Sequence, residues 1–256
     1  MARSVKGLVG TVNVLGVGLD PLTVEELHAE IGRLVRSGER GLVLNANAYC
    51  LNLCFQDPKL RDFFNDAEVV FCDGVGVMLA ARILGGRIPE RITYADWMWQ
   101  LAAFAESMGF SLYFLGGRPG YAMLAARRLK ERFPYLKIIG VRHGYFDRAA
   151  GSPENETVIE EINAAAPDIL LVGFGMPLQE YWLMENWDRL NARVTLTGGA
   201  VFGYVSGRLR RGPRLLTENG FEWLARLLVE PRRLWRRYLI GNPLFLLRIL
   251  RQRFRS

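Results

Sequence analysis

Chemically useful residues occur where the predicted strands of this chain end. Asn45-Ala46-Asn47 follows the apolar run 42–44, and Asp73-Gly74-Val75-Gly76 follows the apolar run 69–72. Three further apolar runs end in Gly116-Gly117-Arg118, Gly173-Phe174-Gly175-Met176-Pro177-Leu178-Gln179-Glu180 and Thr197-Gly198-Gly199-Ala200. Glycines let a ligand approach the backbone, and helices that begin after them offer unpaired N–H groups to a phosphate. The pattern fits a nucleotide pocket and, equally, a set of tight strand-to-helix turns.

The carboxylate best placed for acid–base chemistry is Asp73. A carboxylate at a strand end can accept a proton from a sugar hydroxyl. Aspartate at this place can also cap the helix expected to begin near Val75, and the local sequence alone favours that structural role. Arg91, Gln179 and Arg118 are polar candidates for contacts with a sugar or a diphosphate, although a single arginine is usually a solvated surface residue.

The absence of three sequence motifs narrows the range of possible functions. There is no Asp-x-Asp pair for a divalent ion on a nucleotide diphosphate, no Gly-x-Gly-x-x-Gly and no Walker A loop. We therefore expect no cofactor, and the charge of a leaving group would be met by arginines and helix N-termini. Cys50, Cys54 and Cys72, with only two histidines, form neither a disulfide framework nor a metal site. They favour a reducing cytoplasm.

Alternating strands and helices must position these residues. A capping box begins a helix at Thr23 that runs to about Ser37, Ser152-Pro153-Glu154 begins another, and Pro177 begins one that runs through Leu190. The predicted strands are 11–17, 42–45, 69–72, 111–115, 138–141, 169–172 and 194–196. The predicted fold class is α/β, with a Rossmann-like, mostly parallel sheet, helices on both faces and sites at the carboxyl ends of strands.

The last 51 residues carry the positive charge of the chain. Residues 206–256 hold thirteen arginines, no lysine and three acids, hence a formal charge of +10, whereas the whole chain carries +7. The arginines alternate with large apolar residues, which suits a phospholipid headgroup layer or a lipid-linked phosphate. We expect an α/β catalytic domain over residues 1–205 and an Arg-rich helical membrane-associating appendage over residues 206–256.

Membrane contact should be peripheral. No apolar run reaches the roughly 20 residues that span a bilayer, because residues 239–250 are interrupted by Gly241-Asn242-Pro243 and Arg248. Arg3 and Lys6 precede a glycine-interrupted stretch, so we expect a first strand there and no signal peptide.

Together the motifs resemble the WecG/TagA/CpsF family, glycosyltransferase family 26. The matching segments follow the family order from about Asn45 to Tyr238. They are Asn45-Ala46-Asn47, Cys72-Asp73-Gly74-Val75-Gly76, Arg91-Ile92-Thr93 with Asp96, Gly173-Phe174-Gly175-Met176-Pro177-Leu178-Gln179-Glu180, Gly198-Gly199-Ala200-Val201-Phe202 with Ser206-Gly207, and Gly220-Phe221-Glu222-Trp223 through Arg226-Leu227, Glu230-Pro231-Arg232-Arg233 and Arg236-Arg237-Tyr238.

The resemblance implies an inverting, metal-independent hexosyltransferase. Such an enzyme moves a sugar from a UDP-sugar to a polyprenyl-diphosphate-linked saccharide during synthesis of a cell-surface polysaccharide. N-acetylmannosamine is a frequent cargo, and related enzymes transfer glucose or uronic acids. The implied location is cytoplasmic, peripheral on the inner face of the cell membrane. The implied partners are the UDP-sugar donor, the lipid-linked acceptor and the membrane surface, with no nucleic acid.

The resemblance also assigns roles to residues. It makes Asp73 the base that deprotonates the acceptor hydroxyl, with helix capping as a second duty, and it assigns no metal ligand. Arg226, Arg233 and Arg236 match appendage arginines that reach the diphosphates. The implied substrate-binding residues are Asn45, Asn47, Arg91, Gln179, Gly198, Gly199, Arg226, Arg233 and Arg236.

Four positions depart from the family pattern. Asn45 stands where threonine is frequent, Tyr94 where glycine is usual, Gly203 where aspartate is common and Gly212 where alanine precedes the proline. Asn45 could still donate a hydrogen bond. Tyr94 adds bulk beside the expected pocket, so the donor sugar is less well defined than the class of reaction.

Other functions stay open. One is a non-catalytic module whose arginines bind an anionic membrane or a nucleic acid with steep salt dependence. Another is a nucleotide-sugar oxidoreductase or epimerase, against which the missing glycine fingerprint argues. Exposed apolar surface on the appendage could also be covered by self-association into a homo-oligomer when no membrane is present.

Overall fold

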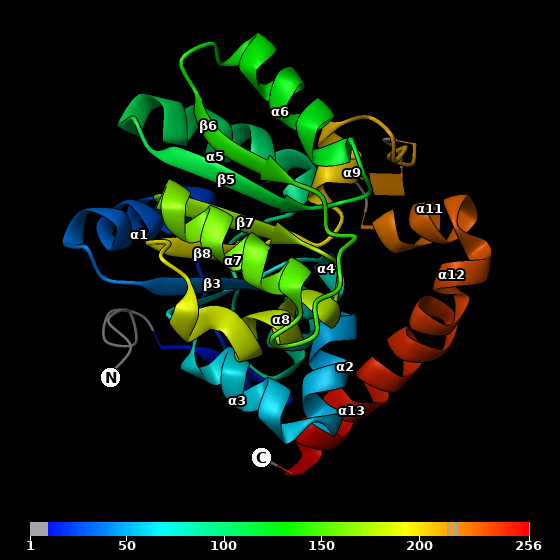
Figure 1. Ribbon diagram of the computed structural model, residues 1–256. Helices are drawn as coiled ribbons and strands as arrows, with labels where there is room; N and C mark the ends of the chain where they lie inside the picture. Colours follow the sequence, from blue (N-terminus) through cyan, green and yellow to red (C-terminus); the bar gives the residue numbers. More distant parts are fainter. Residues whose placement is uncertain (1–9, 214–215, 218–219, 256) are drawn as a thin grey trace. The chain divides into compact units, whose positions relative to one another are not determined.

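The computed structural model describes residues 10–213, 216–217 and 220–255 (Figure 1). The chain forms two compact units. The first unit contains Met1–Thr23, Leu44–Thr93 and Arg210–Ser256, and the second contains Val24–Val43 and Tyr94–Leu209. Arg3 and Lys6, on which the expectation about a signal peptide depends, lie outside the described residues. The domain boundary between residues 205 and 206 stays a prediction.

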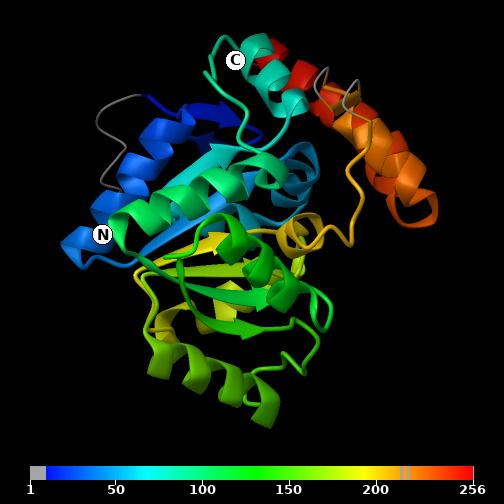
Figure 2. The same cartoon turned by 90° about the horizontal axis from the view of Figure 1, so that it is seen from above.

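Six strands form the main sheet. They are β3 (Gly41–Ala46), β4 (Val69–Cys72), β5 (Ser111–Gly116), β6 (Lys137–Arg142), β7 (Ile169–Gly173) and β8 (Val194–Thr197). Their order is β4-β3-β8-β7-β5-β6, and the pairs β3–β8, β7–β8, β5–β7 and β5–β6 are parallel. Helices lie on both sides of the strands (Figure 2). Strands β3, β4, β7 and β8 are buried along their whole length, as expected of strands covered on both faces. The predicted α/β fold class is confirmed.

The single strand predicted at residues 11–17 is wrong. The structure has two short antiparallel strands there, β1 (Val12–Val14) and β2 (Val17–Leu19). Leu15 and Gly16 between them have φ values of 53° and 86°. Two consecutive positive φ values make the type I′ turn that joins hairpin strands. The side chain of Asn13 supports the turn, because its Oδ1 accepts from Gly16 N at 3.1 Å.

The helices of the second unit start largely where the sequence predicts. They are α1 (Val24–Ser37), α5 (Tyr94–Met108), α6 (Tyr121–Arg132), α7 (Pro153–Ala165), α8 (Leu178–Asn186) and α9 (Val201–Val205). Ser152 caps α7, because its Oγ accepts from Asn155 N at 3.2 Å. The helix predicted through Leu190 becomes a 3-10 turn after Asn186. The Asn186 side chain donates to the carbonyl of Trp182 at 2.8 Å, so it competes with the helical backbone bonds.

The C-terminal segment is part of the first unit. This unit contains α2 (Ala48–Gln56), α3 (Pro58–Asp66), α4 (Val75–Ile83), α11 (Glu222–Val229), α12 (Pro231–Trp235), the π-helical turn η2 (Arg236–Ile240) and α13 (Gly241–Arg255). Helix α13 packs on α2 (Figure 1) and on α4. Asn52 of α2 donates to the carbonyl of Gly241 at 2.8 Å, and Leu15 N donates to Gln252 Oε1 at 2.9 Å. None of the helices in the described part of the chain combines the length and the apolar character needed to cross a membrane.

Candidate functional site

A cavity of about 500 Å³ lies within the first unit. The first turns of α2 and α4 contribute to it, and so do α11, the π-helical turn and α13. Its polar lining residues are Asn47, Asp73, Arg91, Glu222, Arg226, Arg237 and Asn242. Its apolar lining residues include Val75, Leu79, Trp223, Tyr238, Phe245, Leu246 and Ile249. We call this the Asp73 pocket. A pocket with both kinds of lining suits a molecule that is anionic at one end and apolar at the other.

Asp73 follows β4 directly and is fixed beside the end of β3. Its backbone N–H donates to the carbonyl of Ala46 at 2.8 Å, and its Oδ2 accepts from Asn45 Nδ2 at 3.0 Å. The expected hydrogen bond of Asn45 is therefore present. The N-cap of α4 is Gly74, with φ 125°, and no side chain caps this helix. The capping role that the local sequence favours for Asp73 is thus not the one that the structure adopts.

The surroundings of Asp73 increase its basicity. Burial and, next, the Glu222 carboxylate raise the pKa of Asp73 above its ordinary value. The hydrogen bond from Asn45 and the charges of Arg226 and Arg237 act in the opposite direction without cancelling the rise. A carboxylate whose pKa is raised is a better general base at neutral pH than an ordinary aspartate.

Three arginines line the Asp73 pocket in different ways. Arg91 forms an ion pair with Glu222, with 3.2 Å between Nη1 and Oε2. Arg226 comes from α11 and Arg237 from the π-helical turn. The guanidinium of Arg237 lies 4.5 Å from the ring centroid of Tyr49 and donates to Asn47 Oδ1 at 3.4 Å.

Asn47 combines a pocket position with a structural duty. Its Oδ1 accepts from Tyr49 N and from Cys50 N, each at 3.1 Å, and so caps α2. The predicted contact with substrate would have to coexist with this capping role. Cys50 and Cys54, one turn apart in α2, are buried free thiols, as expected.

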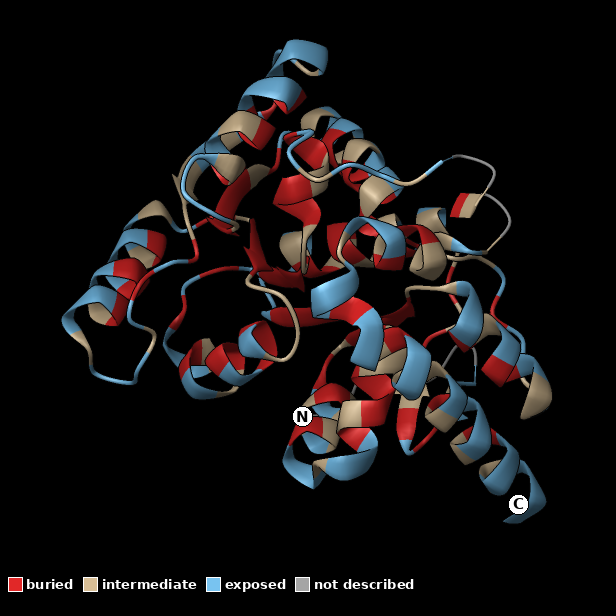
Figure 3. Ribbon diagram, turned by 90° about the vertical axis from the view of Figure 1, so that its right-hand side faces the viewer, coloured by how far each residue is buried: buried red, intermediate tan, exposed pale blue. Residues whose placement is uncertain are grey.

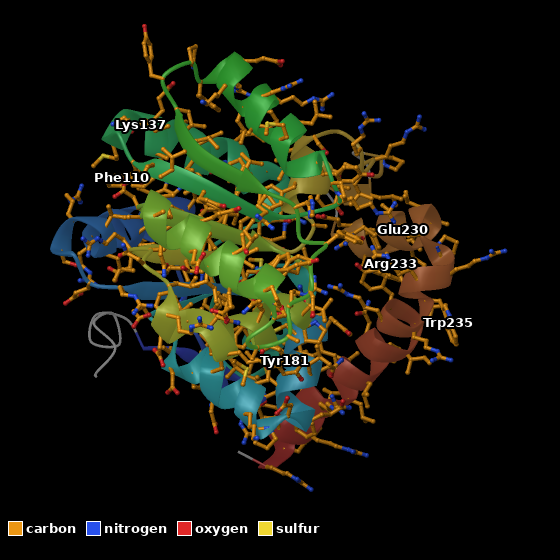
Figure 4. The ribbon with its side chains drawn as sticks, viewed as in Figure 1. Phe110, Lys137, Tyr181, Glu230, Arg233 and Trp235 are labelled. Carbon is orange, nitrogen blue, oxygen red and sulfur yellow. The ribbon has the colours of Figure 1, made fainter. Side chains whose placement is uncertain are left out.

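Arg233 and Arg236 lie at exposed positions outside the lining of the Asp73 pocket. Arg233 pairs with Glu230 one turn earlier, with 3.0 Å between Nε and Oε1 (Figure 4). The guanidinium of Arg236 lies 5.2 Å from the ring centroid of Trp235. Their predicted contacts with diphosphates stay predictions, whereas Arg237, which the sequence analysis did not select, lines the pocket.

Helical periodicity is the signal that could have identified Arg237. Leu234, Tyr238, Phe245 and Ile249 form the buried stripe of the C-terminal helices. At about 100° per residue, Arg237 projects about 60° away from Leu234, whereas Arg236 projects about 160° away, on the opposite side.

Gln179, Gly198 and Gly199 belong to the second unit. Gln179 is fully buried there, and its Oε1 accepts from Gly175 N at 3.2 Å and from Gly199 N at 3.0 Å. Gly198 N donates to the carbonyl of Val172 at 2.7 Å. Gln179 thus holds two glycine loops together, and the predicted contact of these residues with substrate stays a prediction.

Local packing explains three of the departures from the family pattern. A Cβ on Gly203 would lie 3.2 Å from Leu209 Cβ, and one on Gly212 would lie 2.1 Å from Ala225 Cβ. Both glycines therefore make room for a neighbour. Tyr94 is buried in the second unit, where its ring packs edge-on against Trp97 with 5.1 Å between centroids. Its bulk fills the core of that unit.

No three His, Cys, Asp or Glu side chains of the described residues gather closely enough to hold a metal ion. The charged groups around Asp73 are instead one further carboxylate and three arginines. This set can accept a proton from a hydroxyl and can bind an anion beside it.

A mostly parallel α/β sheet and a carboxylate among arginines are features found in enzymes that transfer a group to a hydroxyl. The chain belongs to the glycosyl transferase WecG/TagA/CpsF family, whose sequence profile matches residues 12–256. It is therefore a glycosyltransferase that acts on hexose-type sugars. It is similar to the N-acetylglucosaminyldiphosphoundecaprenol N-acetyl-beta-D-mannosaminyltransferases of Staphylococcus aureus strains MRSA252 and NCTC 8325 / PS 47. Each is 26% identical over 240 residues, which are 93% of this chain and 91% of the relative.

Proposed function

We propose that this enzyme transfers N-acetylmannosamine, with inversion and without a metal ion, from a UDP-sugar to a polyprenyl-diphosphate-linked N-acetylglucosamine. The product would serve the synthesis of a cell-surface polysaccharide. The observation that carries the proposal is the Asp73 pocket, in which a carboxylate, three arginines and an apolar wall line one cavity. The names of the Staphylococcus aureus relatives support both the acceptor and the transferred sugar.

In the proposed reaction Asp73 is the general base. The acceptor hydroxyl loses its proton to the Asp73 carboxylate while its oxygen forms a bond to the anomeric carbon of the donor sugar. The bond between that carbon and the diphosphate of UDP breaks on the opposite face, which inverts the configuration. The electron pair of the broken bond leaves with UDP, and Asp73 later returns its proton to water. The raised pKa of Asp73 favours the proton transfer.

The arginines and α4 would hold the diphosphate of the acceptor. The first turn of a helix leaves N–H groups without intrahelical partners, which suits a phosphate. The space beside this turn is open, because a Cβ built on Gly74 or Gly76 would meet no atom within 4 Å. Val75, Leu79, Phe245 and Ile249 offer apolar surface for the first part of the polyprenyl chain.

The C-terminal helices would rest on the cytoplasmic membrane surface. Much of their outward side is exposed (Figure 3). It carries Leu228, Leu239 and Phe254, which are 69%, 56% and 86% exposed. Exposed arginines from Arg232 to Arg255 lie among these side chains. Large apolar side chains beside cations are what binds a helix to an anionic lipid interface.

A donor panel tests the proposal. Purified enzyme receives a synthetic N-acetylglucosaminyl-diphosphate-lipid and, in turn, UDP-N-acetylmannosamine, UDP-N-acetylglucosamine, UDP-glucose and UDP-glucuronic acid, with and without EDTA. We expect UDP release with UDP-N-acetylmannosamine, unchanged by EDTA, and a product of inverted anomeric configuration by NMR. Preference for another donor would overturn the assignment of the sugar. Loss of activity in EDTA would overturn the metal independence. A product of retained configuration would overturn the role of Asp73 as the general base.

A further inference from the structure

We propose that Arg237 binds the diphosphate of the lipid-linked acceptor and positions it beside Asp73. The inference rests on the proposed function, because it assigns one residue to one part of the proposed substrate. The family resemblance singles out Arg233 and Arg236 on the same helical segment and not Arg237. The geometry of the first unit instead points to Arg237, the residue that follows Arg236.

The surroundings of Arg237 leave its positive charge without a matching anion in contact. Its guanidinium lies near the rings of Tyr49 and Tyr238, with 4.5 Å and 5.5 Å to their centroids. Its one hydrogen bond among the described residues is the 3.4 Å contact with Asn47, and its buried Nε has no hydrogen-bond partner among them. By comparison, Arg91 pairs with Glu222 and Arg233 pairs with Glu230.

A half-buried cation that contacts no anion is costly to the folded state. Desolvation lowers the pKa of Arg237, yet an arginine keeps its charge at any working pH. The charge of Asp73 attracts it at a distance, but the two groups form no ion pair. Such an arrangement destabilises the free protein and is relieved when an anion binds. The planar guanidinium can donate two parallel N–H bonds to two phosphate oxygens.

The helical segment that carries Arg237 also contributes apolar side chains to the same cavity, further toward its C-terminus. Tyr238, Phe245 and Ile249 follow on the same helical segment and line the same cavity. With a rise of about 1.5 Å per residue, Phe245 lies about 12 Å and Ile249 about 18 Å further along the helix. A diphosphate bound at Arg237 therefore shares its cavity with an apolar surface and with Asp73. This combination matches the lipid-linked acceptor better than the diphosphate of UDP.

The π-helical turn explains why Arg237 occupies this place. Pro243 has no N–H, so the carbonyl of Leu239 loses its usual helical partner. The backbone forms a wider, π-helical turn just before the proline, in which Gly241 N donates to the carbonyl of Arg236 five residues earlier. Asn52 secures the turn from α2 through its bond to the carbonyl of Gly241. Helix α13 then begins with Pro243 in its first turn, where proline is tolerated.

Substitution of Arg237 with an internal control tests the inference. Arg237→Gln, Arg237→Lys and the control Arg127→Gln, at an exposed arginine of the second unit, are assayed in the full chain for kcat and for the KM of each substrate. We expect Arg237→Gln to raise the KM of the acceptor about tenfold to a hundredfold, the range for one lost charged hydrogen bond, and to leave the KM of the UDP-sugar within about twofold. Arg237→Lys should fall between wild type and Arg237→Gln. Arg127→Gln should behave as wild type.

Contrary results are distinct. A rise in the KM of the UDP-sugar alone would assign Arg237 to the donor, and unchanged kinetics in Arg237→Gln would remove it from the site. Equal losses in Arg127→Gln and Arg237→Gln would mean that the net charge of the protein matters and not the position of the arginine. Thermal unfolding separates these outcomes from misfolding, because loss of a half-buried cation that contacts no anion should leave the melting temperature unchanged or higher.

A binding measurement separates this inference from the proposed function. Farnesyl diphosphate, a short isoprenyl diphosphate, is titrated into wild type and the variants by calorimetry at fixed ionic strength, with UDP as the second ligand. Farnesyl diphosphate should bind wild type and lose about tenfold or more in affinity in Arg237→Gln, whereas UDP should bind both equally. That result would uphold the site even if no UDP-sugar were transferred. No binding to wild type would overturn it.

Discussion

Asp73 lies where burial and the Glu222 carboxylate raise its pKa, while the Asn45 amide acts against that rise. The two influences set how much of the base is ionised at a given pH. Asn45 stabilises the charged carboxylate, because its Nδ2 donates to Oδ2 at 3.0 Å. The family often has threonine at this position, and the resemblance implied that asparagine could donate in its place.

Asn45→Ala should move the pH profile in a defined direction. Removing the donor destabilises the ionised form, so the pKa of Asp73 rises further. Activity requires the ionised base, so the acidic limb of kcat/KM should shift to higher pH. The measurement is kcat/KM between pH 4 and 9 with the lipid-linked acceptor.

Arg236→Gln is the control for this profile, because Arg236 lies outside the pocket lining. Its acidic limb should coincide with that of wild type. A limb of Asn45→Ala that stays in place, or moves to lower pH, would contradict the role given to the Asn45 hydrogen bond.

Single residues show how far the sequence could lead. The position of Asp73 after a buried strand could be predicted, since strand ends are marked by a change from apolar to polar residues. The choice between catalysis and capping could not, because it depends on whether Gly74 takes the capping position. Gln179 looks like a ligand-binding residue in sequence, yet its full burial between two glycine loops becomes visible only in the fold.

Helix α11 is the element that brings Glu222, Trp223 and Arg226 to the Asp73 pocket. The contact between Ala225 and Gly212 sets how closely α11 approaches the chain at residue 212, because a Cβ at Gly212 would lie 2.1 Å from Ala225 Cβ. Ala225 is 1% exposed, so its side of the contact cannot yield into solvent. The absence of a side chain at position 212 therefore allows α11 to pack there through Ala225.

Gly212→Ala should lower the free energy of unfolding by about 1–3 kcal/mol through overpacking. Ala225→Gly alone should cost about 1 kcal/mol as a glycine within a helix. The double variant should be more stable than the sum of the two effects, because it removes the clash. Urea denaturation of the four proteins measures this coupling.

Gly10→Ala is the matched control, because a Cβ at Gly10 would meet no atom within 4 Å. It should leave the stability close to that of wild type. If the effects of Gly212→Ala and Ala225→Gly on the free energy of unfolding were additive in the double variant, the contact would not set how closely α11 approaches residue 212.

At the level of elements, the sequence predicts what depends on local pattern. The six strands of the main sheet lie within two residues of their predicted ends, because each is an apolar run with turn residues after it. The hairpin at residues 12–19 was missed, since a leucine with positive φ leaves no mark in composition. The π-helical turn was missed as well, although Gly241-Asn242-Pro243 marked a break, because its resolution depends on the contact with Asn52.

The charge of the molecule is divided along the chain. Residues 206–256 carry a formal charge of +10 in a chain of +7. The exposed arginines share the last helix with Leu247, Leu250 and Phe254, which are 44%, 38% and 86% exposed. A nucleic acid would need the charge without the apolar side chains, whereas a lipid interface uses both.

Vesicle flotation tests this at the level of the whole molecule. The full chain should float with anionic vesicles and not with neutral ones, and the bound fraction should fall as salt rises. The variant Arg251→Gln/Arg253→Gln/Arg255→Gln should lose about a hundredfold in affinity, at about 1 kcal/mol per arginine. Arg127→Gln, an exposed arginine of the second unit, is the control and should bind as wild type.

Tighter binding to duplex DNA than to anionic vesicles at the same salt concentration would contradict a membrane partner. Analytical ultracentrifugation adds a second readout. The exposed apolar side chains should drive self-association in buffer and dissociation in mild detergent. A monomer under both conditions would remove the expectation of an oligomer.

The central claim is that Asp73 is the base of a sugar transfer to a lipid-linked acceptor. Turnover of Asp73→Asn with UDP-N-acetylmannosamine and the N-acetylglucosaminyl-diphosphate-lipid tests it most directly. Asparagine keeps the size of the side chain and cannot accept the proton, so kcat should fall about a hundredfold to ten-thousandfold. The melting temperature at neutral pH should stay equal or rise, because burial and Glu222 disfavour the ionised aspartate. Turnover of Asp73→Asn at the wild-type rate would contradict the account.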